Sequence, residues 1–192
     1  NSTVGSYSIN YDPPASSQLG ADIDGEVADD RSGNTVAISS NGDIVAIGSR
    51  YNDDSGADAG HIRVYEWDGT TWNQKGGDID GEAAGDQLSF SLDISGDGTI
   101  LVAGAFTNDG NGADSGHARV YEFDGTSWNQ LGSDFDGEAA GDQNGWSDAI
   151  NNSGDRVAIG ARSNDGSASN AGHVRVYDWD GTTWNQVGAD ID

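Results

Sequence analysis

The amino-acid sequence predicts an all-β fold of four-stranded antiparallel blades, the architecture of a β-propeller, either complete or partial. A unit of 56 residues repeats without gaps from Gly20 to Asp192, so that His61, His117 and His173 occupy equivalent positions. Each unit holds four short apolar segments separated by clusters of Gly, Asp and Asn, and none shows the helical apolar period. Four short strands that recur every 40 to 60 residues or so are typical of propeller blades.

The repeat divides the chain into successive units of one β-propeller domain or of a fragment of one. Three full repeats span residues 20–75, 76–131 and 132–187, and residues 188–192 begin a further one. Residues 1–19 align with the end of the third repeat. They are therefore expected to supply only the outer strand pair of a partial blade.

Each full repeat is expected to form four strands. In the second repeat the predicted strands are Ser89–Ile94, Ile100–Ala105, His117–Phe123 and Ser127–Gly132. Asp124 and Gly125 are a hairpin signal between the last two strands. Because side chains alternate between the two faces of a strand, His117, Arg119 and Tyr121 are expected to share one face.

The charge excludes several classes of function. The chain has 33 acidic and 8 basic residues, a formal net charge of −25, and no cysteine. Nucleic acids need a basic surface and an anionic membrane would repel this chain, so we expect neither partner. No run of about 18 apolar residues is present, so we expect no membrane insertion. Without cysteine there is no disulfide and no thiolate zinc site.

The composition also bears on location and completeness. A hydrophobic content of 34% with this charge is typical of disorder, but the repeated strand pattern favours a folded chain. Salt or divalent cations would relieve the self-repulsion, which favours an extracellular protein, secreted or at the cell surface. The absence of Met, position 1 included, predicts a processed product or a fragment. Asn1 and Asn151 begin N-x-Ser/Thr sequons, which predict glycosylation in a secreted eukaryotic protein.

Several short motifs recur in a constant order within the repeats. G-D-Q-x-x-F/W, a strand, G-D, V-A-I-G-A, N-D-G and G-H-V-R-V-Y follow one another. This order resembles the FG-GAP repeats of integrin α-like β-propellers, in their non-integrin subgroup. Phe90 and Trp146 occupy the aromatic FG position, from which Asn34 departs, and Phe106 and Arg162 replace the Pro of GAP. The resemblance implies a propeller with the FG strand innermost in each blade, and it implies little about activity.

Three full repeats and an outer strand pair are too few to close a ring, since propellers usually have about four to eight blades. Open ends would leave apolar faces and strand edges exposed. We therefore expect either part of a longer propeller or a ring completed by another chain. Two copies would together contribute about seven blades, a number within the range of known propellers.

Acidic segments with the pattern D-x-D-G-E-x-x-G-D join successive repeats and are the main candidate metal sites. Alternating carboxylates along a glycine-containing turn suit calcium, which takes about six to eight oxygen ligands. The alternative is a solvated turn in which Asp-Gly serves the backbone geometry. The calcium candidates are Asp78, Asp80, Glu82 and Asp86 in one copy and Asp134, Asp136, Glu138 and Asp142 in the next, preceded by Asp22, Asp24, Glu26 and Asp30.

A second candidate position lies between the first two strands, where the resemblance to integrin FG-GAP repeats implies calcium binding by D-x-D-x-D-G-x-x-D. Asp93 and Asp97 approach this pattern and are further calcium candidates, but Leu101 replaces its last acid. A third acidic segment, N-D-x-x-G-A-D, includes Asp54. It is expected to be an exposed connector, with a ligand-binding loop as the alternative.

The repeated histidine is interpreted as a buried blade-packing residue with a satisfied ring, because nothing in the sequence pairs it with a Ser nucleophile or a metal cluster. The arginine two residues later is expected to neutralise a neighbouring acid. These arginines are Arg63, Arg119 and Arg175.

We therefore expect a non-catalytic extracellular module that mediates protein association or assembly, self-association included. The alternative is a calcium-dependent adhesin or a glycan-binding module. No cofactor other than calcium is expected. An enzyme is not expected, since an active site usually breaks repeat symmetry and the residues that do so compose no recognisable site. These residues are Arg31, Asn34, Lys75, Trp146 and Asp148.

Overall fold

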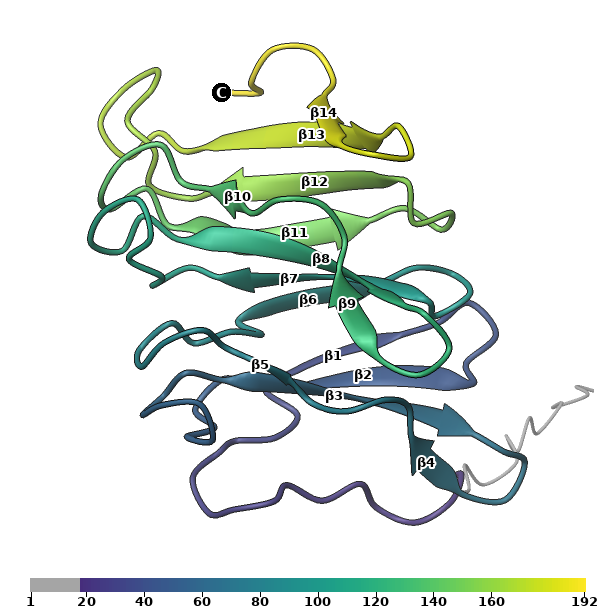
Figure 1. Ribbon diagram of the computed structural model, residues 1–192. Helices are drawn as coiled ribbons and strands as arrows, with labels where there is room; N and C mark the ends of the chain where they lie inside the picture. Colours follow the sequence, from purple (N-terminus) through teal and green to yellow (C-terminus); the bar gives the residue numbers. More distant parts are fainter. Residues whose placement is uncertain (1–17) are drawn as a thin grey trace, which may run out of the picture.

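The computed structural model describes residues 18–192, which form strands, turns and loops (Figure 1). The first blade contains β1 (Thr35–Ile38), β2 (Ile44–Ser49), β3 (His61–Trp67) and β4 (Trp72–Gln74). The second contains β6 (Ser91–Ile94), β7 (Ile100–Ala105), β8 (His117–Phe123) and β9 (Trp128–Gln130). The third contains β11 (Asn144–Ile150), β12 (Arg156–Ala161), β13 (His173–Trp179) and β14 (Trp184–Gln186). Residues 18–192 contain no helix long and apolar enough to span a membrane.

Each blade is an antiparallel meander in which consecutive strands pair. The strand orders are β1-β2-β3-β4 in the first blade and β11-β12-β13-β14 in the third, and the second blade follows the same path. The register repeats as well, because Ala103 pairs with Arg119 in the second blade and Ile159 pairs with Arg175 in the third. The predicted four-stranded antiparallel blade is therefore confirmed.

The start of the following repeat adds a short fifth strand to the first two blades. β5 (Ile79–Asp80) pairs with the beginning of β3, and β10 (Phe135–Asp136) pairs with the beginning of β8. The sequence predicted only a turn at these positions. A strand forms there because the third strand of each blade has seven residues and the fourth only three, which leaves a free edge beside the third strand.

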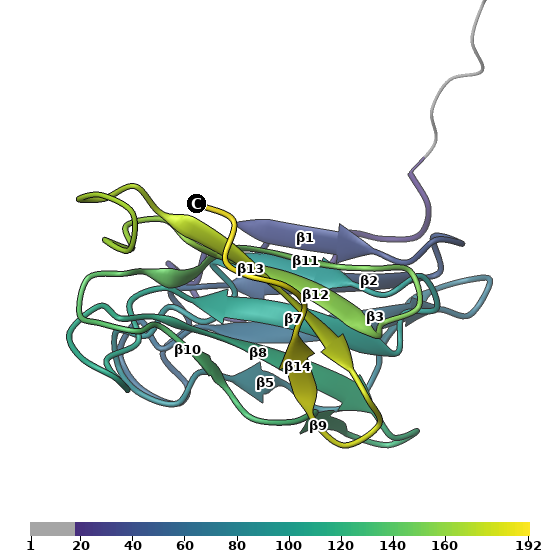
Figure 2. The ribbon, with the colours of Figure 1, turned by 90° about the horizontal axis from the view of Figure 1, so that it is seen from above.

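The three sheets stack face to face as successive blades (Figure 1), and seen from above their strands overlie one another (Figure 2). The first strands of neighbouring blades lie together, since β6 contacts both β1 and β11. Stacked antiparallel blades with equivalent strands adjacent are the β-propeller architecture, so the predicted fold class is confirmed. The partial blade predicted for residues 1–19 falls almost entirely outside the described residues.

The core lies between the blades, with β7 at its centre. Leu101 and Ala103 belong to an apolar cluster with Ile62 of the first blade. Val102, on the opposite face of β7, belongs to a second cluster with Val157 of the third blade. A strand covered on both faces needs a continuous apolar run, which explains the I-L-V-A-G-A sequence of β7.

The glycines of β2 and β7 allow the next blade to approach closely. A Cβ on Gly104 would overlap the carbonyl oxygen of Gly145 and lie 2.5 Å from Oδ2 of Asp148. A Cβ on the equivalent Gly48 would lie 2.6 Å from the Cβ of Ser89. The glycine at this position of β2 and β7 is therefore a packing requirement between blades, in addition to a strand signal.

The aromatic residues at the FG positions meet at one end of the blades. Phe90, Phe106 and Trp146 form a cluster with ring centroids 4.3 to 4.8 Å apart. Arg50 lies over Phe90 at 5.2 Å, and Arg162 lies over Trp146 at 4.1 Å. Residues at the position of the Pro of GAP thus link the blades through aromatic and cation–π contacts.

The first end face of the stack, defined as Val36 and Ile38 of β1, is uncovered by the described residues. These side chains are 63% and 62% exposed. Their equivalents in the second blade, Leu92 and Ile94, are only 8% and 6% exposed because the first blade packs on them. The first blade therefore presents a surface that is buried wherever another blade precedes it.

The last end face, on the third blade, consists of exposed apolar residues whose equivalents one repeat earlier are buried or partly buried. Its members are Val174, Val187 and Ile191. Their equivalents pack between the second and third blades: Ala118, Leu131 and Phe135. Both ends of the stack therefore carry the apolar residues of a blade interface, as predicted for an open set of blades.

Candidate functional site

A buried histidine begins the third strand of every blade. His61, His117 and His173 start β3, β8 and β13 and are all buried. The preceding glycine sets their position. Gly60 has a φ of +80°, and a Cβ there would overlap the carbonyl oxygen of Leu88. The Gly-His pair is thus required by a tight left-handed turn against the next repeat.

In the second blade, an arginine and two carboxylates surround the histidine. Nε and Nη2 of Arg119 donate hydrogen bonds of 2.9 and 2.6 Å to the carboxylate of Asp134. Nη2 also lies 2.5 Å from Oε1 of Glu82. Nδ1 of His117 is 4.0 Å from Glu82 and 3.9 Å from Asp134. Burial raises the pKa of Asp134, but the bonds from Arg119 outweigh it and hold that pKa below its ordinary value.

The third blade repeats this arrangement. Arg175 donates hydrogen bonds of 2.9 and 2.8 Å to Asp190 and one of 2.5 Å to Glu138. Nδ1 of His173 lies 3.7 Å from Asp190. The bonds from Arg175 lower the pKa of Asp190 to about 2. The prediction that the repeated arginine neutralises a neighbouring acid is confirmed in these two blades.

The first blade differs in the position of its arginine. Nη2 of Arg63 donates a hydrogen bond of 2.8 Å to the carbonyl oxygen of Asp24, and Nη1 lies 3.5 Å from Glu26. Among the described residues, no hydrogen bond joins Arg63 to Asp78, which accepts one from Gln74 at 2.5 Å instead. The guanidinium therefore does not bridge the two carboxylates as it does in the other blades.

The expectation of a satisfied histidine ring was wrong for His61. His61 is buried, but neither of its ring nitrogens has a hydrogen-bond partner in the part of the chain that the structure describes. Each histidine also has carboxylates close enough to form a potential metal-ligand group, among them Glu26 for His61. The sequence hides this grouping because Glu82 precedes His117 by 35 residues and Asp134 follows it by 17. Only the constant repeat of all these positions could have suggested it.

The carboxylates of one acidic segment point to different partners. Asp78 joins the group around His61, and Glu82, four residues later, joins the group around His117. Asp86 is buried and accepts hydrogen bonds from the Ala83 amide at 3.1 Å and from Asn108 at 3.0 Å. The predicted ligands of one loop are thus spread over separate groups, and calcium binding by them stays a prediction.

The next segment follows the same division. Asp134 and Glu138 belong to the groups around His117 and His173. Asp142 is buried and accepts hydrogen bonds from the Ala139 amide and the Asn164 side chain. Asp80 and Asp136 lie in β5 and β10 and are exposed.

Asp93 and Asp97, the candidates between the first two strands, have separate protein partners. Oδ2 of Asp93 accepts a hydrogen bond of 2.9 Å from the Ile150 amide in the third blade. Oδ1 of Asp97 accepts bonds from Ser95 at 2.7 Å and from the Thr99 amide at 3.0 Å within its own turn. The first carboxylate thus links two blades, and the second closes the β6–β7 turn.

Asp148 is a buried carboxylate that the sequence singled out only as a departure from the repeat. It occupies the position of Leu92 in the second blade, at the interface between the second and third blades. Its amide donates a hydrogen bond of 2.7 Å to Ser91, but neither carboxylate oxygen has a partner among the described residues. Burial raises the pKa of Asp148 to about 8.

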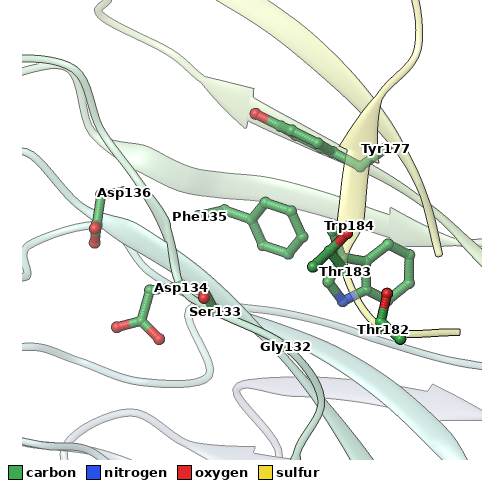
Figure 3. Close-up of a pocket in the computed structure, with 9 residues that line it drawn as sticks. All are labelled: Gly132, Ser133, Asp134, Phe135, Asp136, Tyr177, Thr182, Thr183 and Trp184. Carbon is green, nitrogen blue, oxygen red and sulfur yellow. The ribbon is translucent and has the colours of Figure 1, made fainter. Parts of the chain in front are cut away.

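An open pocket of about 390 Å³ lies beside the third blade (Figure 3). The ring of Phe135 lies between Tyr177 and Trp184, with centroid distances of 4.6 and 5.9 Å. Hydroxyls and carboxylates complete the lining, which includes Asp134, Asp136, Thr182 and Thr183. Equivalent residues line a pocket in the first blade, among them Asp22, Tyr65 and Trp72. The pocket therefore recurs in the first and third blades.

No protein-family model matches the sequence, and no curated protein matches it. Among solved structures, the chain is similar to the β-propeller domain of the Trilobed protease from Pyrococcus furiosus, with 12% identity and a TM-score of 0.47 over 80% of this chain and 42% of that one. It is also similar to the acylaminoacyl peptidase of Pyrococcus horikoshii, with 14% identity and a TM-score of 0.43 over 80% of this chain and 24% of that one. The chain spans less than half of either protein. Neither likeness extends to activity, and membership of the FG-GAP family stays a prediction.

Proposed function

We propose that the chain is a non-catalytic structural and interaction module of an extracellular protein, built of FG-GAP-like blades, which associates through its end faces with the blades of a second copy. The observation that supports this function is the exposure of Val36 and Ile38 at positions where Leu92 and Ile94 are buried by a preceding blade. An apolar surface of this kind usually has a partner.

The two end faces are complementary by repetition. Inside the chain, residues equivalent to the last end face pack against the next blade, and residues equivalent to the first end face pack against the preceding one. The last end face of one copy therefore suits the first end face of another. Such head-to-tail contacts close into a ring when the rotation per blade allows it. Two copies supply about six to seven blades, a size that propellers adopt.

The polar groups support a structural role. Arg119 and Arg175 are engaged by the carboxylates beside them, so these acids are not poised for acid–base chemistry. Asp86 and Asp142 hold their own loops through backbone and Asn contacts. The acids of the repeat thus serve mainly to join segments within and between blades.

Analytical ultracentrifugation over a range of concentrations tests the association. We expect dimers or larger rings for the wild-type chain and a shift to monomer when Val36→Asp and Ile38→Asp are combined. Val27→Asp is the control, because Val27 is exposed and its equivalents Ala83 and Ala139 are exposed in the stacked blades too. A wild-type chain that stays monomeric at its highest soluble concentration would contradict the proposal.

A calcium-dependent or glycan-binding adhesion module is the second candidate, and the pocket in Figure 3 favours it. Aromatic rings beside hydroxyl and carboxylate groups offer both an apolar platform and polar contacts to a sugar. Binding to an array of immobilised glycans, with calcium and after chelation, tests this function. We expect retention that Trp184→Ala removes while thermal unfolding remains cooperative. Retention of no glycan under either condition would rule it out.

A further inference from the structure

The first blade contains a group of four potential metal ligands that the other blades do not reproduce. Ligand atoms of Glu26, Asp54, His61 and Asp78 all lie within 4.8 Å of one another. They come from the segment before β1, the β2–β3 loop, the start of β3 and the segment that leads to β5. The sequence interpreted the loop that holds Asp54 as an exposed connector, so this convergence appears only in the folded chain.

The surroundings of His61 are an independent observation that points to a ligand. The residue is 0% exposed, and neither ring nitrogen has a hydrogen-bond partner within residues 18–192. Nδ1 faces the group and lies 3.9 Å from Oε2 of Glu26, which is too far for a hydrogen bond. A buried polar group without a partner destabilises the fold, so a cation bound at this nitrogen would stabilise it.

The other two blades show what makes the first blade different. In the second blade the guanidinium of Arg119 contacts both the Glu and the Asp beside the histidine, and in the third blade that of Arg175 does the same. In the first blade Arg63 instead donates to the carbonyl oxygen of Asp24. Of the three carboxylates in the group, only that of Glu26 lies within 4.0 Å of the Arg63 guanidinium, at 3.5 Å, which leaves an excess of negative charge beside His61.

The fourth ligand is also particular to the first blade. Asp54 has Gly110 and Gly166 as its equivalents in the second and third repeats. Of the three repeats, the one with this additional carboxylate is thus the one whose arginine does not bridge the two carboxylates beside the histidine. The side chains of Glu26, Asp54 and Asp78 are exposed, so they have the freedom to rotate onto an ion that His61 holds from the buried side.

We propose that Glu26, Asp54, His61 and Asp78 bind one divalent transition-metal ion, with Zn²⁺ as the preferred ion and Mn²⁺ as an acceptable one. Imidazole nitrogen and carboxylate oxygen together suit these ions, and zinc takes four such ligands. Calcium takes oxygen ligands only, so His61 selects against it. The ion would join four separate segments of the first blade and thereby stabilise it beside the first end face.

Titration calorimetry of the full chain with zinc chloride, manganese chloride and calcium chloride tests the site. We expect one strong zinc site per chain, weaker manganese binding at the same site, and no competition by an equal concentration of calcium. Asp54→Gly installs the residue of the other two repeats and should weaken zinc binding roughly 10-fold or more. Asp58→Gly is the matched control, because Asp58 lies in the same loop with a φ of 54°, where glycine fits.

Nuclear magnetic resonance of the histidine rings gives a second readout that does not depend on variants. Zinc should shift the ring signals of His61 and leave those of His117 and His173 in place, because arginine already occupies their groups. Three outcomes would overturn the proposal. They are the absence of stoichiometric zinc binding, equal weakening by Asp54→Gly and Asp58→Gly, and displacement of zinc by an equal concentration of calcium.

Discussion

The surroundings of Asp148 do not suit a charged side chain. This residue replaces the leucine of the preceding blade at the interface between the second and third blades, and its oxygens lack partners among the described residues. Burial disfavours the charged form of a carboxyl group, so the folded protein keeps Asp148 protonated up to about pH 8. A neutral carboxyl group is tolerated there, and an ionised one is not.

The pH dependence of stability follows from this shift. In the unfolded chain Asp148 ionises near its ordinary pKa of 3.8, whereas in the folded chain it does so near 8. Folding therefore binds a proton between these values, and stability falls as the pH rises from about 4 to about 8. Each tenfold change in proton affinity corresponds to about 1.4 kcal/mol.

Asp148→Asn should raise stability at pH 8 and flatten this decline in urea denaturation, with little effect at pH 4. A variant with an unchanged slope would count against a buried, protonated Asp148.

The contribution of an arginine–carboxylate pair to the stability of the fold depends on how deeply the pair is buried. Arg119 is largely buried and holds two carboxylates, so its removal would leave these charges unpaired beside His117. We expect Arg119→Leu to destabilise the chain by about 2 to 4 kcal/mol. Arg156→Leu is the control, because Arg156 and Asp178 form an exposed pair, which contributes little. Guanidinium denaturation should therefore separate the two variants, and equal effects would contradict the structural role of the buried cluster.

At the scale of the strand, a side chain contributes most to stability where neighbouring blades cover both faces of its strand. Leu101 of β7 is fully buried between blades, whereas Val36 of β1 is exposed in the described structure. Leu101→Ala should cost about 2 to 5 kcal/mol of unfolding free energy, since it leaves a cavity. Val36→Ala should cost much less in the monomer. A small effect at Leu101 in denaturant titrations would mean that the blades do not pack as described.

The short strands β5 and β10 are elements whose role depends on the blade that precedes them. Each pairs with the beginning of the third strand of that blade, where the fourth strand does not reach. Phe135 of β10 also packs against Tyr177 of the third blade at 4.6 Å. The acidic segment thus connects two blades through backbone pairing and an aromatic contact, which explains why it recurs in every repeat.

At the scale of the whole molecule, a net charge of −25 opposes compaction. Raising the ionic strength from about 0.01 M to about 0.1 M shortens the screening length from roughly 30 Å to roughly 10 Å. The melting temperature should therefore rise with sodium chloride over this range, as measured by differential scanning calorimetry. Sucrose at matched osmolality is the control for non-ionic effects. A melting temperature that falls or stays constant with salt would show that charge repulsion is not a major cost.

The blade pattern could be predicted from the sequence because it depends on local information. Alternating and continuous apolar runs of four to seven residues define strands, and Asp-Gly and Gly-His pairs mark their ends. The boundaries of β7 and β8 agree with their predicted ranges for this reason. The 56-residue period then requires similar blades to stack, since each one exposes an apolar face that only another can cover.

The sequence by itself therefore determined the four strands of each blade, their antiparallel order and the open stack of blades. Only the tertiary structure decided which carboxylate meets which partner, as when Glu82 and Asp134 meet Arg119 while Asp78 remains apart from Arg63. Strand formation depends on neighbours a few residues apart, which a sequence displays directly. Ion pairing and burial depend on which faces touch after distant segments stack. At the same repeat position an arginine can contact a backbone carbonyl, as Arg63 does, or a carboxylate, as Arg119 does.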